Sequence, residues 1–320
     1  MNRRYFLALS AGVSVGTMFP AIGQEQNPPI PVIDTHIHLF DTNRPQGVPW
    51  PTKNDGILFQ PALPDRYRRI SKPFGIVGAI AVEASPLPED NQWVLEAASK
   101  DEIIVGTVGN LEVGKPAFGR QLERFQANPL FRGIRYGNLW GQDITAQVEN
   151  TKFVSDIRSL NEAGLVLDTA NPNPALLSAI VKLTDRVPDL KVVIDHLPQM
   201  IIPLDKAKQK VYEADLRRLG ERTKVYLKIS EVLHKVDGQI PTSLDFYRAG
   251  LDELYGIFGE DRLLYGSDWP NSDQWLPFGD GMKLVRDYFM AKGRPVAEKY
   301  FWKNSVAAYH WVKRNGTQPG

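Results

Sequence analysis

The chain has 320 residues, of which 42% are hydrophobic and 23% charged, so it carries enough apolar side chains for a folded core and is not disordered by composition. Its 38 Lys and Arg residues against 37 Asp and Glu leave a net charge of +1, which argues against a nucleic-acid-binding protein and favours a small-molecule partner. Because the sequence has no cysteine, disulfides, zinc-thiolate sites and iron-sulfur clusters are excluded, and any metal must be bound by histidines and carboxylates.

The N-terminal segment resembles a twin-arginine export signal. Arg3 and Arg4 precede a weakly apolar stretch rich in Gly, Ser and Ala, and small residues at 21–23 are suited to cleavage. We therefore expect residues 1–23 to be removed, the mature chain 24–320 to begin near Gln24, and the protein to be periplasmic. A retained membrane anchor is the alternative, but the segment is only marginally apolar for spanning, and we expect no stable membrane insertion after cleavage.

Short apolar stretches then alternate with amphipathic ones along the chain. Strands are predicted at 32–35, 76–82, 103–108, 133–136, 164–168, 191–195, 225–229 and 263–267. Apolar residues at helical spacing predict helices over 90–100, 117–127, 151–163, 174–186, 207–222 and 243–258. Eight such alternations predict an α/β protein with a single (β/α)₈ TIM barrel. A doubly wound sheet is the main alternative, but no Gly-x-Gly-x-x-Gly motif opens the first helix.

Three connections are exceptionally long: 40–63, 197–204 and 231–241 follow the first, sixth and seventh predicted strands. In a barrel, long βα loops lie over the C-terminal face and surround the active-site mouth. Trp50 stands between two prolines in the first of them and could form a rigid apolar lid over a ligand, with simple surface packing as the alternative.

Four polar residues lie at the C-terminal ends of predicted strands. His36 and His38 are two positions apart, so strand alternation points both to one face, where they can bind a divalent metal or a polarised substrate group. His196 ends the sixth strand and Asp268 ends the eighth. Because the first and eighth strands of a closed barrel are neighbours, we expect Asp268 to stand beside the histidine pair.

The segments that contain these residues are VIDTHIHLF (32–40), VIDHL (193–197) and LYGSDWP (264–270). They resemble the amidohydrolase superfamily, and most of all its amidohydrolase-related branch, which includes sugar lactonases and pyrone dicarboxylate lactonase. The resemblance extends over nearly the whole mature chain, through NSVAAY (304–309), which is similar to the closing helix of that family. It implies a TIM-barrel hydrolase.

The sequence departs from the binuclear members of this superfamily. Those carry a metal-bridging Lys or acid on the fourth strand and a His on the fifth, whereas this chain has Arg135 with Tyr136, and Asp168, at the corresponding places. The resemblance therefore implies at most one divalent metal ion, zinc or manganese, and is also compatible with a site that uses none. The ligand set it implies is His36, His38 and Asp268, with Glu83 from the second strand as a further candidate.

Hydrolysis of an ester-like bond needs a base that activates water and a group that stabilises charge on the carbonyl oxygen. We assign Asp268 as the general base and proton carrier. His196 and the pair His36 and His38, or the metal they hold, would polarise the carbonyl.

Five further residues are candidates for substrate binding. Arg135 could clamp a carboxylate or a lactone oxygen, and Lys228 alternates with apolar neighbours and could point into the barrel; for both, a structural ion pair is an equal alternative. Trp50 and Trp269 could stack on a sugar ring, with packing as the alternative. The set is Arg135, Tyr136, Lys228, Trp269 and Trp50.

The sequence thus favours an exported hydrolase that opens a small, sugar-derived lactone with water activated by Asp268. Two alternatives remain: a related metal-dependent decarboxylase of a small aromatic or unsaturated acid, and a barrel that binds a carbohydrate without catalysis. The oligomeric state is left open.

Overall fold

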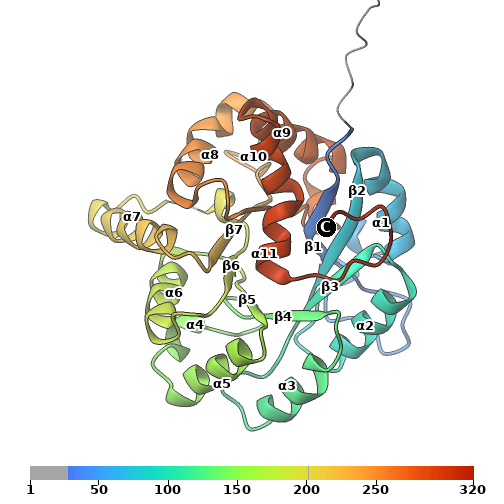
Figure 1. Ribbon diagram of the computed structural model, residues 1–320, viewed down its shortest axis with the longest axis vertical. Coiled ribbons are helices and arrows are strands. Elements are labelled where there is room, and N and C mark those ends of the chain that lie inside the picture. Colours follow the sequence, from blue (N-terminus) through green and yellow to red (C-terminus); the bar gives the residue numbers. More distant parts are fainter. Residues whose placement is uncertain (1–27, 201) are drawn as a thin grey trace, which may run out of the picture.

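A computed structural model describes residues 28–200 and 202–320. Eight parallel strands form one sheet in the order β1 to β8, and helices surround it on the outside (Figure 1). This is the predicted (β/α)₈ barrel. The strands are β1 (Val32–His38), β2 (Ile76–Val82), β3 (Ile104–Gly109), β4 (Phe131–Arg135), β5 (Val166–Asp168), β6 (Val192–Ile194), β7 (Val225–Ile229) and β8 (Leu263–Tyr265).

The connections between strands are mainly helical. The α-helices are α1 (Pro64–Ser71), α2 (Asp90–Lys100), α3 (Phe118–Gln126), α4 (Ile144–Gln147), α5 (Thr151–Glu162), α6 (Pro174–Arg186), α7 (Lys206–Gly220), α8 (Leu244–Phe258), α9 (Phe278–Ala291), α10 (Arg294–Glu298) and α11 (Asn304–Tyr309). Short 3₁₀ turns are η1 (Gly56–Leu58), η2 (Lys72–Phe74), η3 (Leu197–Gln199) and η4 (Asn271–Gln274), and η5 (Lys299–Lys303) is a π-helical turn.

Local sequence explains where several of these helices begin. The side chains of Asn150, Asn173, Asp205 and Ser243 accept hydrogen bonds from backbone N–H groups in the first turns of α5, α6, α7 and α8. Such caps satisfy N–H groups that have no partner within the helix. Pro174 occupies the first position of α6, where its missing N–H costs nothing.

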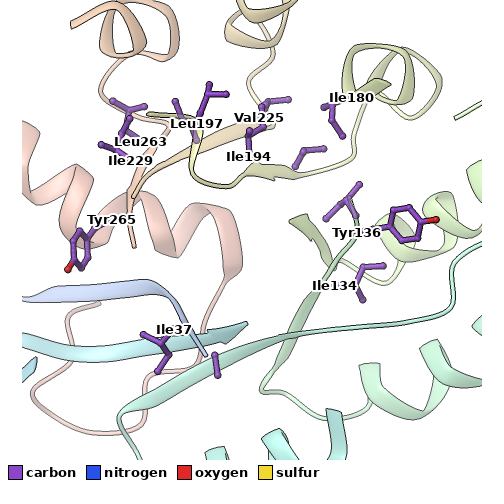
Figure 2. Packing of buried hydrophobic residues seen from close by; sticks show 14 of the residues in the cluster. Ile37, Ile134, Tyr136, Ile180, Ile194, Leu197, Val225, Ile229, Leu263 and Tyr265 are labelled. Atoms are coloured by element: carbon purple, nitrogen blue, oxygen red, sulfur yellow. The ribbon is translucent and has the colours of Figure 1, made fainter. Parts of the chain in front are cut away.

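Alternation along the strands divides the core into two layers. Outward-facing residues such as Ile134, Ile194 and Leu263 pack against the helices, as Figure 2 shows. Inward-facing residues form a second apolar cluster, which includes Ile33, Val193 and Leu264. Tyr309 and Trp311 belong to this inner cluster, and Val312 N donates to Val105 O, so the C-terminal segment packs against one end of the barrel. The polar groups of the site lie in the lumen above this apolar layer.

Closure between β8 and β1 depends on hydrogen bonds made just beyond the end of β8. His38 N donates to Trp269 O (2.7 Å), and Asp268 N donates to His36 O (2.9 Å). The carboxylate of Asp34 accepts from Ser267 N (2.9 Å), and Thr35 Oγ1 donates to Tyr265 O (2.6 Å). These bonds place the chain after β8 directly against β1.

Several predicted strand bounds shift by one to three residues, and the ends of three strands matter for the site. β1 extends through His38 instead of ending at Thr35, since its last residues pair with β2. β6 and β8 end at Ile194 and Tyr265, so His196 and Asp268 lie just beyond their strands. Both residues have positive φ angles, 52° and 58°, which are incompatible with an extended strand.

None of the helices within 28–200 and 202–320 combines the length and the apolar character needed to cross a membrane. The predicted export signal, residues 1–23, lies outside the described residues.

Gly133 lets β4 and β5 approach each other closely, which gives a test of the barrel packing. A Cβ atom at this position would lie 2.5 Å from the backbone O of Val166. We expect Gly133→Ala to lower the free energy of unfolding by about 1–3 kcal/mol, because backbone atoms must move to relieve the overlap. Urea denaturation measures the change.

Gly250→Ala is the matched control. Gly250 is exposed within α8, and an added Cβ meets nothing within 4 Å. Since alanine is the better helix former, this variant should gain up to about 1 kcal/mol. Equal effects of the two substitutions would contradict the close β4–β5 approach.

Candidate active site

The four residues predicted to carry the chemistry meet at the C-terminal end of the barrel. Asp268 Oδ1 lies 3.1 Å from His38 Nε2, 3.4 Å from His36 Nε2 and 3.7 Å from His196 Nε2. All four side chains are buried, with at most 7% of each exposed. One carboxylate oxygen is therefore the centre on which three imidazoles converge.

A register irregularity in β1 aims the two histidines inward. Ile33 belongs to the inner apolar cluster and Ile37 to the outer one, although strict alternation would place both on the same face. The pairing of β1 with β2 shifts between Asp34 and Ile37, which reverses the alternation at this point. As a result His36 and His38 face the lumen while Ile37 packs on the outside.

Three residues that follow β6, β7 and β8 have left-handed backbone conformations. The φ angles are 52° at His196, 49° at Glu231 and 58° at Asp268. Non-glycine residues adopt such angles at an energetic cost, and they concentrate at functional sites. Each turn directs a polar side chain toward the same region of the lumen.

Glu231 lies beside the central carboxylate and was not singled out by the sequence analysis. Asn271 Nδ2 donates to both Asp268 Oδ2 (2.7 Å) and Glu231 Oε1 (3.0 Å), and Gln199 also donates to Glu231. Glu231 Oε2 is 3.6 Å from His196 Nδ1. Its place directly after a strand, like that of His196 and Asp268, is the one sequence signal that indicates it.

The two neighbouring carboxyl groups have opposite pKa shifts. Burial opposes ionisation of Asp268, but the charge of His196 and the hydrogen bond from His38 outweigh burial and hold the pKa of Asp268 well below its usual range. Burial and the charge of Asp268 raise the pKa of Glu231 well above its usual range. Of the two carboxyl groups, Asp268 therefore ionises more readily, which suits the role of a general base.

Below this centre lies a buried cation. Lys228 Nζ is 2.7 Å from Asp168 Oδ2, 2.9 Å from Asp195 Oδ1 and 3.2 Å from His36 Nδ1. Tyr309 donates from its hydroxyl to both oxygens of Asp168 (2.8 and 3.0 Å). Burial lowers the pKa of Lys228, but the two carboxylates outweigh burial and raise it, so Lys228 stays charged. Burial and the charge of Lys228 lower the pKa of His36, so this imidazole is neutral.

Arg135 and Glu83 form a second ion pair, at the wall of the site. Arg135 Nε donates to Glu83 Oε1 (2.7 Å) and Nη2 donates to Glu83 O (2.9 Å). Trp140 Nε1 donates to the same carboxylate at 3.0 and 3.2 Å. These bonds hold the guanidinium in one orientation, and in the described part of the chain no hydrogen bond uses Arg135 Nη1.

A cavity opens above these groups. It contains about 690 Å³ not filled by protein atoms, including its open mouth, which is within the range of small-molecule sites. Trp50 and Trp140 supply apolar surface, and the ring of Trp50 meets that of His38 edge-on at 5.7 Å. The polar lining residues are His38, Arg135, Asn171, His196, Glu231, Asp268 and Asn271.

Three expected substrate contacts do not reach this cavity. Tyr136 turns outward and packs against Phe153, with ring centroids 5.0 Å apart, because it alternates with the inward-facing Arg135 (Figure 2). Trp269 is fully buried against Tyr67 and is not part of the mouth. Lys228 is held below the site by its carboxylate partners.

The donor set at the centre fits a metal ion. His36, His38 and Asp268 bring one ligand atom each within 4.8 Å of one another, and His36 Nε2 is buried without a hydrogen-bond partner in the described chain. Imidazole nitrogen and carboxylate oxygen suit zinc. These buried groups could therefore bind a divalent metal. Glu83 is in none of the three candidate groups within 28–200 and 202–320, because Arg135 and Trp140 engage its carboxylate.

Trp140, Asn171 and Asn271 line the cavity but were not predicted. Trp140 precedes Gly141 and has a positive φ of 57°, and Asn171 has one of 49°. A glycine or asparagine soon after a predicted strand is a weak indication of such turns, because these residues tolerate positive φ.

Comparison with known proteins yields a family match and several relatives. The family model described as Amidohydrolase matches residues 33–311. An L-fucono-1,5-lactonase of Burkholderia ambifaria is 25% identical over 253 residues, which cover 78% of this chain and 83% of that protein.

Solved structures show the same fold. An amidohydrolase of Burkholderia multivorans with bound zinc superposes with a TM-score of 0.77 at 22% identity, over 88% of this chain and 99% of that one. A protein from Pseudomonas putida described as a putative 2-pyrone-4,6-dicarboxylic acid hydrolase superposes with a TM-score of 0.67 at 20% identity, over 88% and 98% of the two chains.

The buried cation gives a prediction about stability. Lys228→Met leaves Asp168 and Asp195 buried without their cation, so we expect the free energy of unfolding to fall by about 3–5 kcal/mol. Lys283→Met is the control, since Lys283 pairs with Asp287 on the exposed surface of α9 and should change stability by less than about 0.5 kcal/mol. Chemical denaturation of both variants measures the change in the free energy of unfolding. Similar losses in the two variants would contradict the role of Lys228 as the cation that balances Asp168 and Asp195.

Proposed function

The chain belongs to the amidohydrolase family and is a hydrolase, and from this premise we propose that it opens a small, sugar-derived lactone with water activated by Asp268. The observation that carries the proposal is the convergence of three imidazoles and a fixed guanidinium around one buried carboxylate in an open cavity. The similarity to an L-fucono-1,5-lactonase supports a lactone as the substrate.

The cavity lining supports a sugar-derived substrate in particular. A sugar lactone has an apolar ring face and several hydroxyl groups at its edge. Trp50 and Trp140 provide flat apolar walls, while Asn171, Asn271 and Glu231 offer amide and carboxylate groups that can hydrogen-bond hydroxyls. The positive charge of Arg135 is already balanced by Glu83, which favours a neutral lactone over a dicarboxylate.

In the proposed reaction, a water molecule beside Asp268 attacks the lactone carbonyl and gives its proton to the Asp268 carboxylate. Arg135 donates a hydrogen bond to the carbonyl oxygen as negative charge develops there, and His196 and His38 stabilise the same charge from the other side. The ester bond to the ring oxygen then breaks. The proton held by Asp268 passes to that oxygen, so the product is a hydroxy acid and Asp268 returns to its starting state.

We further propose at most one divalent ion, zinc or manganese, held by His36, His38 and Asp268. When bound there, such an ion would polarise the carbonyl group and lower the pKa of an adjacent water. The zinc bound to the relative from Burkholderia multivorans supports this proposal.

Asp268→Asn tests the assigned base. The variant keeps the shape of the side chain but cannot accept the proton, so we expect kcat to fall by about 10²–10⁴. Proton release by the mature chain is measured against a panel of sugar and pyrone lactones. Asp280→Asn, the same substitution at an exposed position of α9, should leave the rate unchanged.

The outcomes of this assay separate the alternatives. Equal rates for the parent and Asp268→Asn would remove Asp268 from the reaction. If no lactone is hydrolysed with or without added zinc or manganese, release of carbon dioxide from small aromatic acids would identify a decarboxylase instead, and ligand-induced stabilisation without turnover would identify a binding protein.

The walls of the cavity give a second kinetic prediction. Trp50→Ala should raise KM about three- to tenfold, because a sugar ring loses its stacking surface. Tyr136→Phe should leave KM unchanged, since its ring faces the helices. Steady-state kinetics on the lactone identified by the panel measures both, and a larger effect at Tyr136 would contradict the placement of the substrate.

We also propose that the protein is exported to the periplasm, on the basis of the Arg3-Arg4 motif. In a Gram-negative host, we expect the full-length chain to be recovered in the periplasmic fraction with an N-terminus near Gln24. Replacing both arginines by lysine should retain it in the cytoplasm. Recovery of an intact N-terminus in cytoplasmic protein from the unaltered gene would refute this assignment.

A further inference from the structure

Lys228 is the group beneath the active site that the proposed reaction does not use. Its Nζ has three polar neighbours: Asp168 Oδ2 at 2.7 Å, Asp195 Oδ1 at 2.9 Å and His36 Nδ1 at 3.2 Å. The side chain is fully buried, so water does not compete for its hydrogens. An ammonium group has three N–H donors and no acceptor, which matches three neighbours that can each accept.

This arrangement favours one position for the proton of His36. Because Lys228 can only donate, its contact with His36 Nδ1 requires a lone pair on that nitrogen. A neutral imidazole carries one proton, so the proton is then on Nε2. His36 Nε2 lies 3.4 Å from Asp268 Oδ1 without forming a hydrogen bond to it, and in this tautomer Nε2 offers a proton and not a lone pair to the centre of the site.

The same tautomer opposes metal binding. A histidine binds a metal through a nitrogen lone pair, and its other nitrogen usually donates to a carboxylate or carbonyl oxygen. To bind a metal through Nε2, His36 would have to carry its proton on Nδ1 and turn that N–H group away from Lys228.

Asp195 is the acceptor that the second tautomer needs. Its Oδ2 lies 3.5 Å from His36 Nδ1 and accepts no hydrogen bond within the described ranges, whereas its Oδ1 is paired with Lys228 Nζ at 2.9 Å. Lys228 and Asp195 therefore compete for one nitrogen: the lysine donates to it, and the carboxylate would accept from it.

We propose that Lys228 is a positioning residue that holds His36 in the tautomer with its proton on Nε2, and thereby weakens binding of a divalent metal by His36, His38 and Asp268. The inference rests on the proposed function in one respect, that His36, His38 and Asp268 are the groups that would hold the metal. The affinity of the site for metal then depends on Lys228, which is not itself a ligand.

The experiment exchanges the partner of His36 without changing the net charge of the buried cluster. In the double variant Lys228→Met with Asp168→Asn, one cation and one carboxylate are removed together, and Asp195 remains to accept from His36 Nδ1. Asparagine can still accept from Tyr309 through its amide oxygen. Asp168→Asn alone, which keeps Lys228, is the matched control.

Zinc affinity is the first readout. Calorimetric titration of the three purified proteins with zinc chloride should show about ten- to hundredfold tighter binding by the double variant than by the parent or Asp168→Asn. Adding His38→Asn to the double variant should abolish the gain, which shows that the zinc is bound at this site. Equal affinities in the parent and the folded double variant would overturn the inference.

The second readout needs only the unaltered protein. Nitrogen NMR of the parent, with the His36 signals assigned by comparison with His36→Gln, should show the proton of His36 on Nε2. A proton on Nδ1 would overturn the inference even if the double variant fails to fold. Neither readout uses lactone turnover, so failure of the proposed function and failure of this inference are distinguishable.

Discussion

The structure depends on hydrogen bonds that join the end of β1 to the segment after β8. His38 N and Asp268 N each bond to a carbonyl of the other segment, so the backbone contact that closes the barrel is made by the residues of the reaction centre themselves. Asp34 strengthens the same junction from the outer side by accepting from Ser267 N. Because the side chains are carried by this junction, loss of closure would also separate the imidazoles from the carboxylate.

Burial of charge is the second constraint on this protein. Isolated charges in a barrel lumen are costly, and here both buried cations have partners of opposite sign: Lys228 lies between two carboxylates, and Arg135 lies against Glu83. These pairs also orient the groups above them, since one holds a guanidinium toward the cavity and the other contacts His36. Structural ion pairs and substrate-facing groups are therefore parts of the same network.

The family match and the geometry support the function in different ways. The match over residues 33–311 assigns the chain to the amidohydrolases. The cavity adds what the family alone does not provide, namely tryptophan walls, amide groups and an arginine whose charge is balanced. The same barrel can serve many reactions, so the proposed substrate rests on these lining residues and not on the fold.

Much of this could be predicted from local sequence. The helices Asp90–Lys100 and Pro174–Arg186 have their predicted bounds, and eight strands alternate with helices as expected, because periodicity and terminal signals act over a few neighbouring residues. The sequence by itself also determined that His36, His38, His196 and Asp268 would meet, since strand ends in a barrel share one face. Only the tertiary structure decided that Lys228 binds carboxylates, that Tyr136 faces the helices and that Glu231 joins the site. These outcomes depend on strand register and on partners from distant strands, which no local pattern contains.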